Sequence, residues 1–288
     1  MKTVIIIDSC SDLPLEYVKQ HNIPVVNFTY HFKGKDCPDD LGQTISYREF
    51  YDAIRNGEMP TTSQVNAQTY VNLFRKYVLE GKSIVYLCFS SALSGSYNNS
   101  LIARNMITEE IPEADISIID TKSASLGEGL LVYYAIDMLE KGASKEEIIN
   151  WVENNKLKLH HWFTVEDLGH LKRGGRLSGT AAFVGSILDI KPVLNVDDEG
   201  RLIPRIKVKG RKKALRTLIE KMEENIISPE QQVIAISHGD SRHDADYLAE
   251  LIRSRFQVKD IIINSIGPVI GSHSGPGTVA VFFMGGNR

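Results

Sequence analysis

The first half of the chain repeats one pattern, in which a short apolar run is followed by a polar loop and a segment of helical periodicity. Residues 4–7 form a β-branched run without alternation, which predicts a strand buried on both faces. The pattern recurs at residues 83–107 and 115–140. It predicts a parallel sheet with crossover helices, in which ligands bind at the carboxyl ends of the strands.

The periodicity also predicts the individual elements of this half. We expect strands at residues 4–7, 23–30, 83–89 and 115–119. A turn is expected at residues 33–35. Helices are expected at residues 13–20, 47–55, 67–79, 97–107 and 130–140.

After about residue 155 strands become more frequent, at 162–165, 193–196, 202–208, 233–238, 261–266 and 278–284. Helices are expected at 167–171, 179–188, 212–225 and 244–255. The turn at residues 197–200 predicts an antiparallel hairpin. We therefore predict an α/β fold with two domains and a ligand site between them. Residues 1–155 form a Rossmann-like domain with a parallel sheet, and residues 156–288 form an α/β domain with a mixed or antiparallel sheet.

Composition narrows the class of protein. The chain has 288 residues, 42% of them hydrophobic, and a formal net charge of −3, which argues against a nucleic-acid binder. Its three cysteines lack paired spacing, which fits a reducing compartment. The first apolar run is too short for a signal peptide, and no run approaches the ~18–20 apolar residues of a membrane helix. We expect a soluble, cytoplasmic protein.

Four loops rich in glycine and small polar residues are candidates for a binding site, namely residues 61–64, 90–96, 120–129 and 267–277. Hydroxyls and free backbone N–H groups at a helix start favour an anion, although helix capping is the commoner role of any one such loop. A buried carboxylate needs several such donors. The candidate ligand-binding residues in these loops are Thr62, Ser63, Ser94, Gly95, Ser123, Gly127 and His273.

Histidines and basic residues leave alternatives open. His273 lies among glycines and prolines that allow close approach to a ligand, or it bonds a neighbouring carbonyl. His160 and His161 are interpreted as surface or core-edge residues without a metal-binding spacing. Basic residues concentrate at 172–176 and 201–216, as a solvated face or as a docking surface for phosphate, nucleotide or an acidic partner.

No complete catalytic motif is present in the sequence. There is no phosphate-binding loop with Gly-Lys-Ser/Thr and no Gly-x-Ser-x-Gly elbow. The segment Asp8-Ser9-Cys10-Ser11-Asp12 is similar to an aspartyl-phosphatase loop, but its second acid comes too late. We expect a non-enzyme without metal or cofactor. The alternative is a hydrolase or phosphatase that acts on a lipid-like substrate through Ser94 or Asp8.

Five segments in order resemble the DegV family of bacterial fatty-acid-binding proteins. They are Asp8-Ser9-Cys10-Ser11-Asp12-Leu13, Thr62-Ser63-Gln64, Ser90 to Tyr97, Leu168 to Ser178 and Gly267 to Gly277. Two departures are Val65, where the family usually has proline, and Ser96, where it has threonine.

The resemblance implies two α/β domains with one long-chain fatty acid, such as palmitate, buried between them. It implies that Thr62, Ser94 and His273 hold the carboxylate. It also implies a partner, an ATP-dependent fatty acid kinase that phosphorylates the bound carboxylate to an acyl phosphate for phospholipid synthesis. Arg173, Arg176 and Arg205 are the candidates for contact with that kinase.

Overall fold

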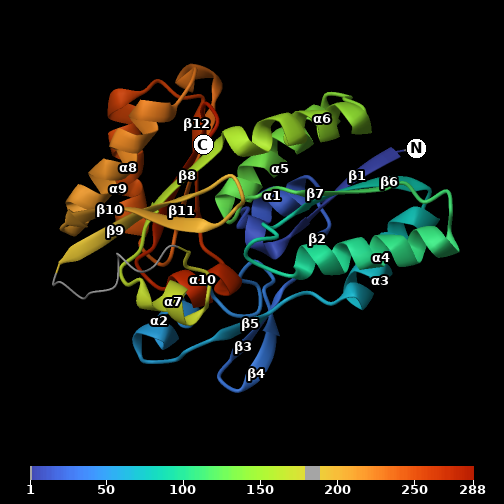
Figure 1. Ribbon diagram of the computed structural model, residues 1–288, viewed down its shortest axis with the longest axis horizontal. Coiled ribbons are helices and arrows are strands. Elements are labelled where there is room, and N and C mark those ends of the chain that lie inside the picture. The colour runs from blue at the N-terminus through green and yellow to red at the C-terminus, as the bar shows by residue number, and fades with distance from the viewer. Residues whose placement is uncertain (1, 179–188) are drawn as a thin grey trace.

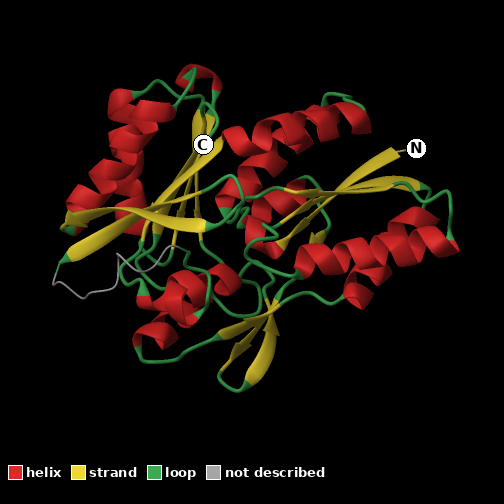
Figure 2. Ribbon diagram, viewed as in Figure 1, coloured by secondary structure: helices red, strands yellow, loops and turns green. Residues whose placement is uncertain are grey.

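The structure is a computed structural model that describes residues 2–178 and 189–288. Strands form two main sheets and one small sheet, and helices lie between and outside them (Figures 1 and 2). The α/β fold with one parallel and one mixed sheet is confirmed. The helix predicted at 179–188 lies outside the described residues.

The first main sheet is fully parallel, in the order β2-β1-β6-β7. Its strands are β1 (Lys2–Asp8), β2 (Val25–Val26), β6 (Lys82–Cys88) and β7 (Ile116–Asp120). Side chains of β1 alternate between two cores: Ile6 packs in the core that holds α3, and Ile5 and Ile7 pack in the core that holds α5. Burial on both faces explains the uninterrupted apolar runs.

Helices of this half agree closely with the periodicity. They are α1 (Leu15–Gln20), α2 (Tyr47–Arg55), α3 (Ala67–Leu79), α4 (Ser96–Glu110) and α5 (Leu126–Glu140). A sixth helix, α6 (Lys145–Asn155), was not predicted. It begins with a capping box in which Ser144 and Glu147 satisfy each other's backbone N–H groups. That spacing is a readable signal for a helix start.

A small antiparallel sheet has the order β4-β3-β5. It comprises β3 (Thr29–Phe32), β4 (Lys35–Pro38) and β5 (Thr61–Ser63). The single strand predicted at 23–30 is therefore wrong, because the chain leaves the parallel sheet after Val26. At the crossing point the backbone N–H of Phe28 donates to Ser9 Oγ at 3.1 Å. The segment predicted as a loop at 61–64 contributes the edge strand β5.

The second main sheet is mixed, in the order β10-β9-β8-β13-β11-β12. Its strands are β8 (Leu159–Thr164), β9 (Ile190–Val196), β10 (Leu202–Lys209), β11 (Val233–His238), β12 (Asp260–Ser265) and β13 (Val279–Met284). Strands β11 and β12 are parallel and the other neighbours are antiparallel, which confirms the predicted hairpin of β9 and β10. Helices α8 (Arg211–Asn225) and α9 (Arg242–Arg255) pack on one face.

Helix α5 joins the two main sheets. It lies between them (Figure 1) and contacts β1 and β6 of one sheet and β8, β11 and β13 of the other. One core cluster therefore contains Ile5, Leu131, Phe163 and Phe282. The division of the chain into domains at residue 155 stays a prediction.

Two short helices border the space between the sheets, α7 (Gly169–Arg173) and α10 (Pro268–Ser274). Helix α10 corrects the expectation of an irregular loop at 267–277. Pro268 begins the helix, where its missing N–H costs nothing, and Gly275, at φ +76°, ends it. His273 consequently projects from the last turn of a helix. The described residues also include 3₁₀ turns at Ser9–Ser11, Lys156–Lys158 and Pro229–Gln231.

Candidate functional site

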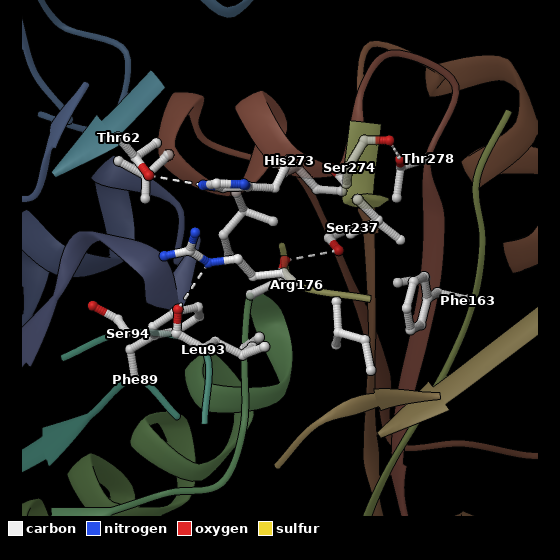
Figure 3. A pocket seen from close by; sticks show the side chains of 18 of the residues that line it. Thr62, Phe89, Leu93, Ser94, Phe163, Arg176, Ser237, His273, Ser274 and Thr278 are labelled. Carbon is white, nitrogen blue, oxygen red and sulfur yellow. Dashed lines mark hydrogen bonds between the residues drawn. The ribbon is translucent and has the colours of Figure 1, made fainter. Parts of the chain in front are cut away.

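An apolar cavity lies between the two main sheets (Figure 3). The space between its walls, including its opening, amounts to about 830 Å³. Apolar side chains from both halves of the chain form the walls, among them Phe28, Phe89, Leu93, Phe163, Leu202 and Phe282.

Thr62 and His273 meet at one end of this cavity. Thr62 Oγ1 on β5 lies 2.7 Å from His273 Nε2 on α10 (Figure 3). A second, outward-facing hollow is lined by Thr62, Arg176 and His273 as well, together with Met59, Pro60, Thr61, His170, Arg173, Gly174 and Ser272. The Thr62–His273 pair therefore stands at the boundary between an apolar interior and an outward-facing hollow.

The imidazole of His273 is neutral at pH 7. Burial lowers its pKa to about 4, and the positive charge of Arg176 contributes to the shift. Nδ1 is buried without a hydrogen-bond partner among the described residues. We assign the proton to Nε2, because a bare lone pair at Nδ1 is cheaper to bury than an unpaired N–H. In this tautomer Nε2–H donates to Thr62 Oγ1 and leaves the Thr62 hydroxyl hydrogen free for a ligand.

Gly174 fixes the position of this imidazole. A Cβ atom at Gly174 would lie 2.1 Å from His273 Nδ1. The backbone after α7 therefore approaches the ring as closely as glycine allows. This contact explains why a glycine follows Arg173.

Ser94 lies in the cavity wall immediately before α4. Its Oγ accepts from the backbone N–H of Ser96 at 3.2 Å and lies 2.9 Å from Ser96 Oγ. Ser96 Oγ in turn accepts from the backbone N–H of Val65 at 3.0 Å. When the Ser96 hydroxyl donates to Ser94, the hydrogen of Ser94 is free to point into the cavity.

Arg176 brings a positive charge into the cavity wall. Its Nε donates to Leu93 O at 3.1 Å and its Nη1 to Gly174 O at 2.6 Å. Among the described residues, the Nη2 group of Arg176 donates no hydrogen bond. Arg176 was predicted to contact a partner protein, whereas the structure places it in the cavity wall.

Of the other candidate residues, Ser63 lines the cavity, whereas Gly95, Gly127 and Ser123 do not. Ser63 lines the cavity beside Thr62. Gly95 and Gly127 permit close packing, because a Cβ atom would lie 2.0 Å from Gln64 Oε1 and 2.2 Å from His161 Nε2, respectively. Ser123 is buried and its Oγ donates to Thr121 O at 3.1 Å, away from the cavity wall.

Several residues of the cavity wall were not predicted from the sequence. His161 is 3% exposed and lines the cavity, so the surface interpretation of His160 and His161 is wrong. The predicted strand began at residue 162, whereas β8 begins at Leu159 and takes both histidines into the sheet. Ser125 and Ser237 also line the cavity. Strand alternation signals Ser237, which follows Val233 and Ala235 on the face toward the shared core.

The structure offers little to the alternative of an autonomous hydrolase. Asp8 is fully buried and accepts from Tyr86 Oη and from the backbone N–H groups of Cys10 and Phe89, with burial raising its pKa to about 6. In the described part of the chain, no histidine or carboxylate hydrogen-bonds Ser94 Oγ. Nor does any group of three or more potential metal ligands occur there.

The basic stretch at 201–216 is largely engaged with its own surroundings. Arg201 pairs with Asp197, Arg211 with Asp244, and Lys213 with Glu220. Arg205 is exposed on β10, and its Nε donates to Asn195 Oδ1 at 2.8 Å. It lines neither the cavity nor the outward hollow. These contacts favour a solvated basic face over a docking surface. Among the described helices, none is long and apolar enough to cross a bilayer.

Comparisons with known proteins agree with the geometry. The model of the DegV family, described as uncharacterised, matches residues 2–285. A DegV domain-containing protein of Clostridium perfringens is 51% identical over 287 residues, covering 100% of this chain and 99% of that protein. The crystal structure of a fatty-acid-binding DegV family protein from Streptococcus agalactiae is 31% identical, with a TM-score of 0.86 and 100% coverage of both chains. A Thermus thermophilus DegV family protein described by its fatty acid binding is 28% identical, with a TM-score of 0.90 over 99% of this chain and 100% of that one.

Proposed function

The chain belongs to the DegV family, and we propose that it binds one long-chain fatty acid in the cavity between its sheets. The observation that carries the proposal is the boundary position of Thr62 and His273. One side of this pair is an apolar cavity and the other is an outward-facing hollow. A fatty acid has the same division, with a long apolar chain and one charged end.

Burial of the acyl chain supplies the affinity. Each buried CH₂ contributes about 0.8 kcal/mol. The aromatic and aliphatic walls from both sheets keep the chain away from water. Affinity of this kind is not selective for the head group, which needs polar contacts of its own.

The polar end of the cavity meets the needs of a carboxylate. Thr62 has a hydroxyl hydrogen that the bond from His273 leaves free, and Ser94 has one when the Ser96 hydroxyl donates to it. Arg176 contributes a positive charge that offsets the desolvation of the anion. His273 orients Thr62 through its Nε2–H.

We further infer that the protein presents this carboxylate to an ATP-dependent kinase rather than converting it alone. The outward hollow reaches the Thr62–His273 pair, and Arg173 lines it. Arg173 Nη2 lies 3.1 Å from His170 Nδ1. In the reaction, a carboxylate oxygen attacks the γ-phosphorus of ATP, and ADP leaves. Arg173 is suited to attract the phosphates. Arg205 has less support as a contact for the kinase, since it lines neither the cavity nor the outward-facing hollow.

Two measurements test the proposal separately. Calorimetric titration with stearate should give one binding site per chain, and a chain that takes up no stearate contradicts the binding function. Addition of a fatty acid kinase catalytic subunit and ATP should then yield stearoyl phosphate only when this protein is present. Acyl phosphate formation at the same rate without the protein would contradict the presentation role.

A further inference from the structure

The wall of the apolar cavity contains two further hydroxyls that contact each other, those of Ser125 and Ser237, which we name the serine patch. Both line the cavity and are at most 6% exposed. Ser125 Oγ lies 2.9 Å from Ser237 Oγ. Figure 3 shows that Ser237 lies apart from Thr62 and Ser94. Hydroxyls in an otherwise apolar wall need hydrogen-bond partners to offset their desolvation.

Ser125 reaches the cavity at a conformational cost. Its backbone has φ 56° and ψ −148°, at the edge of a region that glycine normally occupies alone. It stands at the N-cap position of α5, yet its side chain makes no capping hydrogen bond. The hydroxyl instead contacts the Asp12 carboxyl and Ser237 Oγ. The Ser125 hydroxyl thus contacts Asp12 and Ser237 instead of capping α5, and its backbone is strained at this position.

The hydrogen bonds of the patch are incomplete. Ser274, which also lines the cavity, has a buried Oγ without a hydrogen-bond partner among the described residues. Ser237 Oγ has the single partner Ser125 in that part of the chain. Ser125 has one hydroxyl hydrogen, so it donates either to Asp12 or to Ser237. Both arrangements leave hydroxyl oxygens of the patch able to accept a further hydrogen bond. When Ser125 donates to Ser237, the hydroxyl hydrogen of Ser237 is also free to donate.

We propose that the serine patch binds a hydroxyl group carried on the acyl chain, so that the protein accepts monohydroxy fatty acids. A hydroxyl both donates and accepts, and it fits the patch in either arrangement of the Asp12–Ser125–Ser237 hydrogen bonds. A plain methylene at this position leaves the free acceptor sites of Ser125 and Ser237 unused. A site built to bond a hydroxyl discriminates against a ligand that lacks it, because buried polar groups are then left unpaired. This inference rests on the proposed function and specifies its ligand class.

Calorimetric titration of the full chain with stearate and a positional series of monohydroxystearates tests the inference. At least one isomer should bind as tightly as stearate or more tightly. Ser237→Ala should weaken that isomer about tenfold, the effect of one lost hydrogen bond, while leaving stearate nearly unchanged. Ser254→Ala is the matched control, because Ser254 is exposed on α9 and its Oγ donates to Leu251 O.

The outcomes separate this inference from the proposed function. If stearate binds and every hydroxystearate binds more weakly, by the same factor in the wild type and in Ser237→Ala, the serine patch is no hydroxyl site. A preferred isomer that Ser237→Ala leaves unaffected overturns the assignment to this patch. Failure to bind stearate overturns both proposals. Retention of stearate binding by Ser237→Ala shows that the variant is folded.

Discussion

Thr62 Oγ1 and His273 Nε2 lie 2.7 Å apart although 211 residues separate them in the chain. Thr62 comes from an edge strand of the small sheet and His273 from the last turn of α10. The contact joins the N-terminal and C-terminal halves at the mouth of the apolar cavity. Since the neutral imidazole directs the Thr62 hydroxyl, each residue has a different role in binding an anion.

Loss of the head-group hydroxyls is predicted to weaken fatty acid binding. Thr62→Val and Ser94→Ala each remove one donor to a carboxylate, and each should raise the Kd for stearate about tenfold to a hundredfold. Thermal unfolding should show a modest loss of stability, about 1–3 kcal/mol, because Thr62→Val leaves the His273 Nε2–H and Ser94→Ala the Ser96 N–H without an acceptor. Calorimetric titration measures the effect. Unchanged affinity in both variants would show that the carboxylate binds elsewhere.

Gly174→Ala is predicted to displace the His273 ring. The new methyl group would meet Nδ1 at 2.1 Å, and the Gly174 φ of −73° itself tolerates alanine. Stearate affinity should fall about tenfold or more as the Thr62 contact is lost. Gly175→Ala is the matched control, because it has open space but a φ of +69°. It should cost about 1 kcal/mol of stability and leave affinity intact. Equal affinity losses in the two variants would contradict this account.

The buried imidazole is predicted to make stability depend on pH. With a folded-state pKa of about 4 against 6.5, the unfolded chain binds more protons between these values. Stability therefore falls as pH decreases from 6.5 to 4. His273→Gln removes this contribution, so the wild type should lose stability relative to the variant across that window. Urea unfolding of both proteins at several pH values measures the difference, and a constant difference would exclude a buried neutral imidazole.

Asp12 is predicted to make the stability of the fold depend on pH in the opposite direction. Burial raises its folded-state pKa from 3.8 to about 7. The folded chain then binds more protons between these values, so stability falls as pH rises from 3.8 to 7. Asp12→Asn mimics the protonated acid, and asparagine tolerates the φ of 50° at this position. The variant should become progressively more stable than the wild type over this range in urea unfolding. A pH-independent difference would contradict the buried, proton-binding carboxyl.

Buried strands were the most predictable part of the fold. Strands such as β1, β6 and β11 are covered on both faces, so their apolar runs are uninterrupted. Helix α10 was missed because its glycine suggested a loop. Gly271 instead allows close packing, as a Cβ atom would lie 2.6 Å from Tyr51 Oη. Glycine is therefore needed at this position because of a tertiary contact, which cannot be predicted from local helix propensity.

The site was predictable only in part. Short motifs singled out Thr62, Ser94 and His273, and a family resemblance gave them a shared role, but periodicity alone does not show that they converge. Ser237 was not predicted, because it is the next-to-last residue of an apolar strand and its role depends on which face of β11 lines the cavity. Arg176 illustrates the same limit, since its charge was evident while its position beside Leu93 was not.

Native mass spectrometry of the freshly purified protein tests the central claim most directly. The account predicts an added mass equal to one long-chain fatty acid, released on denaturation and identified by lipid analysis. Ser94→Ala purified in parallel should carry less of it. A ligand-free protein that also takes up neither added stearate nor palmitate would contradict the claim that this cavity is a fatty acid site.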